Sequence, residues 1–183
     1  MNTSQKKEDI LSAAEKLFYE YGFRGVGVKQ IIKEAKVANM TLYNHFSSKE
    51  HLVEEVLKRR EERYWSYLDT FVHGKNDTPF LIAVEAHGKW LEEESYQGDM
   101  FLRAIEDYAG TDNDIENIAR SHKSKLLRYF QDLAKQIDEG DYQDIAYYFT
   151  LLLEGATSMS TLIGSQKATA YAKDIAKKIV YTI

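Results

Sequence analysis

The sequence predicts an all-α protein, with a small three-helix head followed by a C-terminal helical bundle and about nine helices in total. Apolar residues recur with helical spacing along nearly the whole chain. No segment shows the strict alternation that is typical of a half-buried strand. The 183 residues include one proline, Pro79, and ten glycines, so long helices can run without interruption. The hydrophobic fraction of 44% is enough for a packed core.

The first fifty residues carry the pattern of three helices. Gly22 follows the first apolar stripe and is expected to cap it in the left-handed conformation. The third helix is expected to bury Leu42 and Phe46. The predicted helices of this head cover residues 10–21, 28–35 and 39–46, with a turn at residues 36–38.

Capping signals mark the starts of several later helices. Ser47 with Glu50 forms an S-x-x-E capping box, and Asn113 with Glu116 resembles another. Thr78 and Pro79 are typical of an N-cap and a first helical residue. Loops are expected at residues 74–77 and 140–141. The remaining predicted helices cover about residues 47–73, 78–94, 99–109, 113–137, 142–163 and 165–181.

The charge of the chain is unevenly distributed. Residues 1–60 hold 11 Lys and Arg against 8 Asp and Glu, whereas residues 61–183 hold 13 against 21. A mildly basic head on an acidic body suits a head that meets an anion. Ordinary surface variation is the alternative explanation.

Cysteine is absent, which excludes disulfides and thiolate metal sites but does not fix the compartment. The longest apolar stretch, residues 145–153, is far too short to span a bilayer. Glu8 and Asp9 interrupt the N-terminal region, which therefore does not fit a signal peptide. We expect an intracellular protein without a membrane contact.

The second and third helices, each of about eight residues, are joined by a three-residue turn, which is the arrangement of a helix-turn-helix. Such a pair cannot bury itself, and the helices on either side supply the missing cover. The third helix would then lie in the major groove of DNA, with its N-terminal residues reaching the base edges.

A set of residues spread over positions 8–55 makes this interpretation more specific. The set consists of Tyr21–Gly22–Phe23, Ile31, Ala35, Val37, Thr41–Leu42–Tyr43, His45–Phe46, Ser48–Lys49–Glu50 and Leu52. This pattern resembles the tetracycline-repressor-like (TetR family) transcriptional regulators. The resemblance implies a DNA-binding domain over residues 1–50 and a ligand-binding and dimerisation domain over residues 51–183.

The predicted DNA-binding residues fall into two groups. One group carries donors for phosphate oxygens: Thr41, Tyr43, His45 and Lys49. By resemblance the other group faces bases, with Asn suited to adenine, Lys to guanine and Met to a thymine methyl: Asn39, Met40, Asn44 and Lys29. Gly27 and Val28, at the start of the second helix, complete the set. The alternative is that Tyr43 and His45 are core residues and that the base-facing residues are solvated surface.

Three residues depart from the family pattern. Gly27 stands where Ser or Thr is frequent, so it offers only its backbone N–H to a phosphate. Lys36 stands where Gly is frequent, and a left-handed conformation there would cost on the order of 1 kcal/mol. Met40 replaces a more usual Gly or Pro. These departures concern the operator sequence and leave the mode of binding unchanged.

The body is rich in aromatic residues, and Arg60, His87 and His122 fall on otherwise apolar stripes. By resemblance a ligand cavity lies among these helices, and apolar walls with a few polar groups suit a small molecule. The alternative is that these side chains are ordinary core residues. The candidate ligand-binding residues are Arg60, Tyr64, His87, Trp90, Phe101, Tyr108, His122, Tyr129 and Phe149.

The helix at residues 142–163 is apolar on more than one face, so one face covers the body and another needs a partner. The resemblance implies that the last two helices pair with their copies in a two-fold dimer, which fits a palindromic operator. The alternative is a monomer in which this helix is fully internal. The predicted interface residues are Phe149, Leu152, Gly155, Ala156, Met159, Tyr171, Ile175 and Ile179.

An enzyme is the main rival class, but the sequence lacks H-E-x-x-H, G-x-S-x-G and P-loop motifs. We therefore predict no catalytic residue, cofactor or metal. The predicted function is a ligand-responsive regulator, a repressor by resemblance, that binds double-stranded operator DNA as a homodimer and is released by a small-molecule inducer. Its predicted location is the bacterial cytoplasm, at the nucleoid. The second rival is a DNA-binding dimer that answers to a protein partner or to no ligand.

Overall fold

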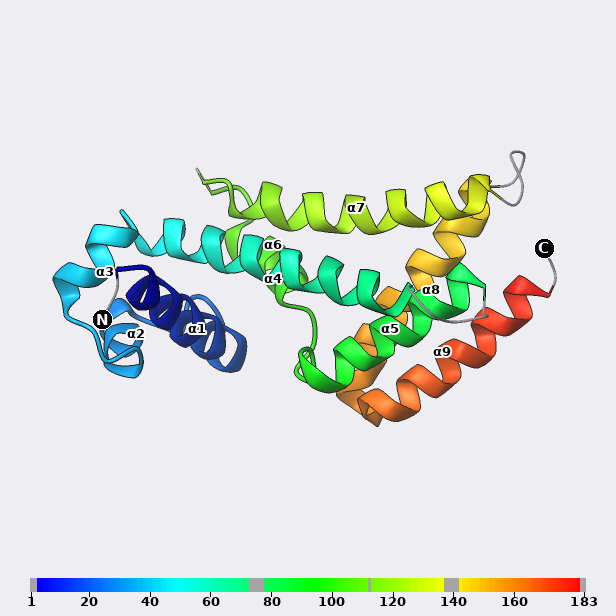
Figure 1. Ribbon diagram of the computed structural model, residues 1–183, viewed down its shortest axis with the longest axis horizontal. Helices are drawn as coiled ribbons and strands as arrows, with labels where there is room; N and C mark the ends of the chain where they lie inside the picture. The colour runs from blue at the N-terminus through cyan, green and yellow to red at the C-terminus, as the bar shows by residue number, and fades with distance from the viewer. Residues whose placement is uncertain (1–2, 73–77, 112, 137–141, 182–183) are drawn as a thin grey trace. The chain divides into compact units, whose positions relative to one another are not determined.

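The computed structural model describes residues 3–72, 78–111, 113–136 and 142–181. Every regular element within these ranges is an α-helix, which confirms the predicted all-α class (Figure 1). None of the described helices is both long and apolar enough to cross a membrane. The helices are α1 (Thr3–Tyr21), α2 (Val28–Glu34), α3 (Asn39–His45), α4 (Lys49–Val72), α5 (Pro79–Glu93), α6 (Met100–Tyr108), α7 (Ile115–Lys135), α8 (Tyr142–Ile163) and α9 (Ser165–Val180).

The chain forms two compact units. The first takes in residues 1–61 and 100–120, and the second takes in residues 62–99 and 121–183. Helix α6 therefore packs with the N-terminal helices, whereas the predicted domain boundary at residue 50 assigns it to the C-terminal domain. The predicted loop at residues 74–77 and the break at residues 140–141 lie outside the described residues.

The core of the first unit is built where the apolar stripes of α1, α3 and α4 meet. Leu42 and Phe46 are fully buried, as the sequence predicts. The ring of Phe18 lies 5.4 Å from that of Phe23, which in turn meets the edge of Tyr108 from α6 at 5.9 Å. This core holds the short helices α2 and α3, which have too few turns to be stable alone.

Two backbone positions have the conformations expected from the sequence. Gly22 has φ +78° and donates its N–H to the Phe18 carbonyl at 2.9 Å, which ends α1. Lys36 has φ +53°, in the left-handed region that disfavours a side chain. The cost of about 1 kcal/mol for a left-handed side chain in this turn therefore applies to Lys36.

The capping of α4 differs from the prediction by one residue. Helix α4 begins at Lys49, and the Ser48 hydroxyl accepts the His51 N–H at 3.0 Å in place of the expected Ser47 with Glu50. Ser47 instead donates its N–H to His51 Nδ1 at 3.2 Å. Two adjacent serines offer two registers for the same motif, and a polar ring at residue 51 decides between them.

The caps of α5 and α7 follow the prediction more closely. Thr78 accepts the Leu81 N–H at 3.5 Å, with Pro79 in the first turn. Before α7, Asn113 Oδ1 accepts the Ile115 N–H at 3.1 Å, whereas the Glu116 carboxylate accepts from the Gly110 N–H instead of closing a capping box.

The second unit packs α8 and α9 side by side, with α5 against both (Figure 1). Phe80, Phe130 and Phe149 stack in its core, with ring centroids 4.3–6.1 Å apart. Gly88 of α5 meets Thr169 of α9 so closely that an added Cβ would lie 2.1 Å from the threonine methyl. This glycine sets how near α9 can approach α5.

Candidate DNA-binding site and ligand-binding region

The helix-turn-helix is held by buried residues of each helix and by its turn. Ile31 anchors α2, and Leu42 anchors α3, both without exposed surface. Between the helices, the Val37 N–H donates to the Ile32 carbonyl at 3.1 Å, and the Thr41 N–H donates to the Ala38 carbonyl at 2.9 Å. The left-handed Lys36 lets the chain reverse within so few residues, so α3 starts at Asn39 at a defined angle to α2.

The outer face of α3 carries the residues predicted to face bases. Asn39, Met40 and Asn44 are exposed, and Met40 keeps 72% of its surface accessible. A methionine in such a position has no packing role within the chain. Tyr43, predicted to contact phosphate, is also exposed at 47% and is therefore not a core residue.

The other predicted phosphate ligands are half-buried. Thr41 lies in the first turn of α3, His45 is its last residue, and Lys49 opens α4. The Lys49 ammonium lies 6.0 Å from the Phe18 ring centroid, and burial lowers the pKa of this amine. Packing along the Lys49 stem restricts its motion, which reduces the entropy lost when it binds an anion.

The start of α2 is capped within the chain. The Gly27 N–H donates to Gln30 Oε1 at 2.7 Å, so in the free protein the donor predicted to meet a phosphate points at a side chain. An added Cβ at Gly27 would have its nearest neighbour at 3.8 Å, so a larger residue fits there. The next residues, Val28 and Lys29, are half-buried and exposed respectively.

Cations of the first unit divide into two groups by their partners. Among the described residues, one group pairs with acids at 2.7–3.8 Å: Lys7, Lys16, Arg24, Lys58, Arg59, Arg60 and Arg120. Arg103 donates to the Phe18 and Tyr19 carbonyls. Within the same described part of the chain, the other group has no ion pair within 4 Å: Lys6, Lys29, Lys33, Lys36 and Lys49. Four of these five lie on α2, in its turn or at the start of α4. The uncompensated positive charge is thus concentrated around the helix-turn-helix.

In the second unit, His87 lies in a chain of hydrogen bonds that crosses three helices. The Tyr64 hydroxyl is 3.0 Å from His87 Nδ1, and His87 Nε2 is 2.8 Å from the Thr157 hydroxyl. The Thr157 hydroxyl donates to the Leu153 carbonyl at 2.9 Å, so the network assigns the proton to Nε2. Burial, with the Lys123 charge as a smaller cause, lowers the pKa of His87 to about 3. His87 is a neutral, satisfied core histidine.

Aromatic rings surround Tyr64 closely. Its ring centroid lies 5.3–5.9 Å from those of Trp65, His87, Trp90 and His122. The sequence analysis did not select Trp65, although its indole Nε1 is buried without a hydrogen-bond partner among the described residues. Its position next to Tyr64 on α4 is the sequence signal that could have identified it. The predicted Tyr129 also contacts Trp65, with ring centroids 5.8 Å apart.

The nine predicted ligand-binding residues are not one cluster. Arg60, Phe101 and Tyr108 belong to the first unit. Arg60 is buried there, 2.9 Å from Glu15 and with its guanidinium 4.9 Å from the Tyr19 ring centroid. Such a paired charge ties α4 to α1.

Phe149, predicted for both the ligand site and the dimer surface, has no exposed area, and its ring centroid lies 4.3 Å from that of Phe80. It belongs to the core of the second unit, because the helical turn directs its ring inward. Ala156 is also buried, whereas the predicted interface residues Gly155 and Met159 are exposed.

An apolar groove of about 350 Å³ runs between α8 and α9. It contains six of the eight predicted interface residues. Leu151, which the prediction omitted, is 68% exposed beside it. Its lining is Leu151, Leu152, Gly155, Ala156, Met159, Ile163, Ala168, Tyr171, Ala172 and Ile175.

No group of three or more His, Asp or Glu side chains suited to a metal occurs within the described ranges. A partly buried lysine of the second unit, Lys123, instead has two acidic partners. Lys123 pairs with Asp99 and with Glu154, at 2.8 Å to the latter. Burial opposes the charge of Lys123, but the two carboxylates outweigh it and raise the pKa of the amine.

A helix-turn-helix with unpaired lysines around it, followed by a helical bundle, is typical of a helix-turn-helix DNA-binding protein. Residues 10–56 match the sequence model of the family described as "Bacterial regulatory proteins, tetR family". Residues 10–56 therefore place this part of the chain in the TetR family.

Named relatives and a solved structure agree with this family. The HTH-type transcriptional regulator UidR of Escherichia coli (strain K12) is 41% identical over 73 residues, which cover 40% of this chain and 37% of UidR. The HTH-type transcriptional repressor KstR2 of Mycolicibacterium smegmatis is 34% identical over 71 residues, which cover 37% of this chain and 35% of KstR2. The matched stretches thus span little more than a third of these relatives.

Similarity over the whole chain is seen at the level of fold. The TetR-family regulator SCO4454 of Streptomyces coelicolor superposes with a TM-score of 0.90, covering 98% of this chain and 96% of that one at 20% identity.

Proposed function

We propose that the protein is a transcriptional regulator, a repressor, that binds a palindromic operator as a homodimer and is released by a small molecule. The observation that carries the proposal is the outer surface of α2 and α3. Asn39, Met40, Tyr43 and Asn44 are exposed there, next to lysines that have no ion pair within the described part of the chain. Amide and apolar side chains can read base edges in a major groove, and free lysines can neutralise phosphates.

Residues 1–50 are proposed as the DNA-binding domain and residues 51–183 as the domain for ligand and dimer. Repression is supported by KstR2, which is named a transcriptional repressor. A protein that acts on chromosomal operators works in the cytoplasm, at the nucleoid.

The proposed ligand site is narrowed to Trp65 and its neighbours His122 and Tyr129. The buried Trp65 indole N–H has no acceptor among the described residues, and an unsatisfied buried donor costs about 1–3 kcal/mol. A flat molecule with a hydrogen-bond acceptor would satisfy this donor and stack on the rings. Tyr64 and His87 are less suited, because the ring nitrogens of His87 already bond Tyr64 and Thr157.

The proposed dimer surface is the groove between α8 and α9. Gly155 supports this assignment, since no atom lies within 4 Å of an added Cβ there. A glycine in a helix interior costs about 1 kcal/mol of helix stability relative to alanine, and no contact within the chain requires a glycine at residue 155. Close approach of a second copy would require one, because it needs a position without a side chain.

The DNA-binding proposal is tested by selecting sites from random duplex DNA with the wild type and Tyr43→Ala at two salt concentrations. We expect the wild type to enrich a palindromic site and the variant to lose or weaken it. Enrichment of no site at either salt concentration would refute DNA-binding as the function.

The dimer is tested by analytical ultracentrifugation of Gly155→Arg and of Lys173→Arg, a conservative change on α9 outside the groove lining. We expect Gly155→Arg to be monomeric and folded, and Lys173→Arg to sediment as the wild type does. A monomeric wild type would refute the dimer.

Ligand control is tested by thermal unfolding of the wild type and Trp65→Phe across a panel of flat aromatic acceptors. A compound that binds the native state raises the melting temperature. We expect a compound that stabilises the wild type, stabilises Trp65→Phe less and releases operator DNA. If no compound does so, the rival function remains: a DNA-binding dimer of the same fold that answers to a protein partner or to no ligand.

A further inference from the structure

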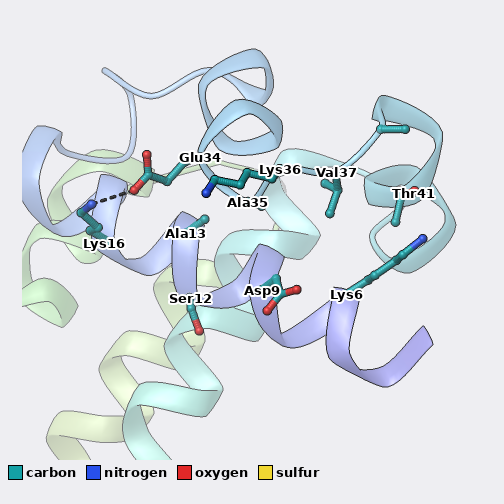
Figure 2. Close-up of a pocket in the computed structure, with 11 residues that line it drawn as sticks. Lys6, Asp9, Ser12, Ala13, Lys16, Glu34, Ala35, Lys36, Val37 and Thr41 are labelled. Carbon is teal, nitrogen blue, oxygen red and sulfur yellow. Dashed lines mark hydrogen bonds and ion pairs between the residues drawn. The ribbon is translucent and has the colours of Figure 1, made fainter. Parts of the chain in front are cut away.

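A hollow of about 670 Å³, with several charged side chains in its lining, lies in the first unit between α1 and the turn that joins α2 to α3. Lys6, Asp9 and Lys16 line it from α1 (Figure 2). Lys36 and Thr41 line it from the turn and from α3. The hollow therefore adjoins the proposed DNA-reading helix, yet two of its lysines, Lys6 and Lys36, are not among the predicted DNA-binding residues.

The charges around the hollow are not balanced equally. Lys16 is neutralised by Glu34, with 2.7 Å between Nζ and Oε1. Lys6 and Lys36 have no ion pair within 4 Å among the described residues. Asp9 is the remaining acid of the lining, and it accepts a hydrogen bond from Gln5 at 2.9 Å. The hollow thus has one net positive charge and two ammonium groups without a carboxylate partner.

Figure 2 shows how these groups are arranged. Lys6 extends from α1 toward the side of the hollow where Thr41 lies, and the Lys16–Glu34 pair closes the opposite side. A cation and a hydroxyl that face one space are the donors that bind a phosphate oxygen. Thr41 also lies on the same short helix as the exposed Asn39 and Met40, so a phosphate held at Thr41 would flank the bases that α3 meets.

We propose that this hollow binds a phosphate of the DNA backbone, with Lys6 and Thr41 as its ligands and Lys36 as a second cation at its rim. Helix α1 is then a third DNA-contacting element besides α2 and α3. The inference rests on the proposed function. Lys6 and Lys36 position the protein along the duplex and read no bases, because phosphates carry no sequence information.

The proposal predicts opposite effects for two substitutions in the same hollow. Lys6→Gln removes a phosphate ligand, so we expect about three- to tenfold weaker binding to the selected operator near 100 mM salt. The slope of log K against log salt should become shallower by about one unit per head. Asp9→Asn removes the opposing carboxylate but keeps an acceptor for Gln5, so we expect tighter binding. Lys36→Gln should weaken binding as Lys6→Gln does.

Lys58→Gln is the matched control, because Lys58 is an exposed lysine of the first unit that already pairs with Glu55 at 3.1 Å. We expect it to change affinity by less than about twofold, since a paired exposed cation adds little to a screened field. Fluorescence anisotropy from 75 to 300 mM salt gives the affinities, and circular dichroism checks that each variant is folded.

The outcomes separate this inference from the proposed function. If the wild type binds no DNA, the proposed function fails. If the wild type binds, Tyr43→Ala weakens binding and Lys6→Gln leaves both affinity and salt slope unchanged, only the phosphate site is refuted. Titration with inorganic phosphate gives a further arm. Binding of free phosphate that depends on Lys6, with operator affinity unchanged, would assign the hollow to a small anion and overturn the DNA contact.

Discussion

Gly88→Ala should destabilise the second unit, although helix propensity alone predicts the reverse. Alanine inside a helix is favoured over glycine by about 1 kcal/mol. At this position, however, the new Cβ would lie 2.1 Å from Thr169 Cγ2, 2.7 Å from Oγ1 and 2.9 Å from Cβ. Rotating the threonine moves the first two atoms but leaves the third, so α5 and α9 must separate.

Overpacking of this kind costs about 1–3 kcal/mol, and more where backbone must shift. After the gain in propensity, we expect a net loss of about 1–2 kcal/mol, or roughly 2–8 °C in melting temperature for a chain of this size. Urea unfolding followed by circular dichroism gives the free energy directly. Thr169→Ala in the Gly88→Ala background should recover part of the loss, although it removes the hydrogen bond from Thr169 to the Ser165 carbonyl.

The sign of the effect decides the question. A Gly88→Ala variant that is about 1 kcal/mol more stable than the wild type would follow helix propensity alone. It would show that α9 does not pack against α5 as closely as described. Equal effects of Gly88→Ala in the wild type and in Thr169→Ala would show that the two residues do not interact.

Three further predictions concern single buried or strained groups. In the unfolded chain the pKa of His87 is near the ordinary value of 6.5, whereas burial in the folded protein lowers this pKa to about 3. The stability that this difference contributes is complete above pH 6.5 and is lost as the pH falls, so unfolding at pH 5 should need about 2 kcal/mol less than at pH 7.5. Urea titrations at both values measure this difference, and His87→Gln should reduce it. Glu15→Ala removes a buried carboxylate partner of Arg60 and should cost about 3–5 kcal/mol in chemical unfolding, whereas Glu15→Leu with Arg60→Met should be nearly neutral. Lys36→Gly relieves the left-handed strain but adds unfolded-state entropy, so a net gain of about 0.5–1 kcal/mol is expected, and a loss of stability would contradict the strain.

The helices were predictable because their signals are local. Apolar spacing located α1 to α9, and Gly22 and Lys36 have the left-handed conformations that their positions indicate. Capping was predictable only to within a residue where two candidates adjoin. Ser48 took the role expected of Ser47 because the His51 ring bonds the residue before it.

Partners distant in sequence were not predictable. The apolar stripe of α4 indicated that Arg60 is buried, but nothing local pointed to Glu15, 45 residues away. Gly88 gives no signal until Thr169 is seen beside it. The same limit applies to the candidate site: exposure of α3 followed from its periodicity, whereas the hollow beside Lys6 exists only once α1 packs next to the turn.

The groove between α8 and α9 would make the activity of the protein depend on its concentration in the cell. If a second copy closes the groove, as proposed, the fraction of chains able to engage both halves of an operator depends on their total concentration. Below the dimer dissociation constant, dimer concentration rises as the square of chain concentration. Halving expression would then reduce operator occupancy up to fourfold, so synthesis rate becomes a control on the regulated genes alongside the inducer.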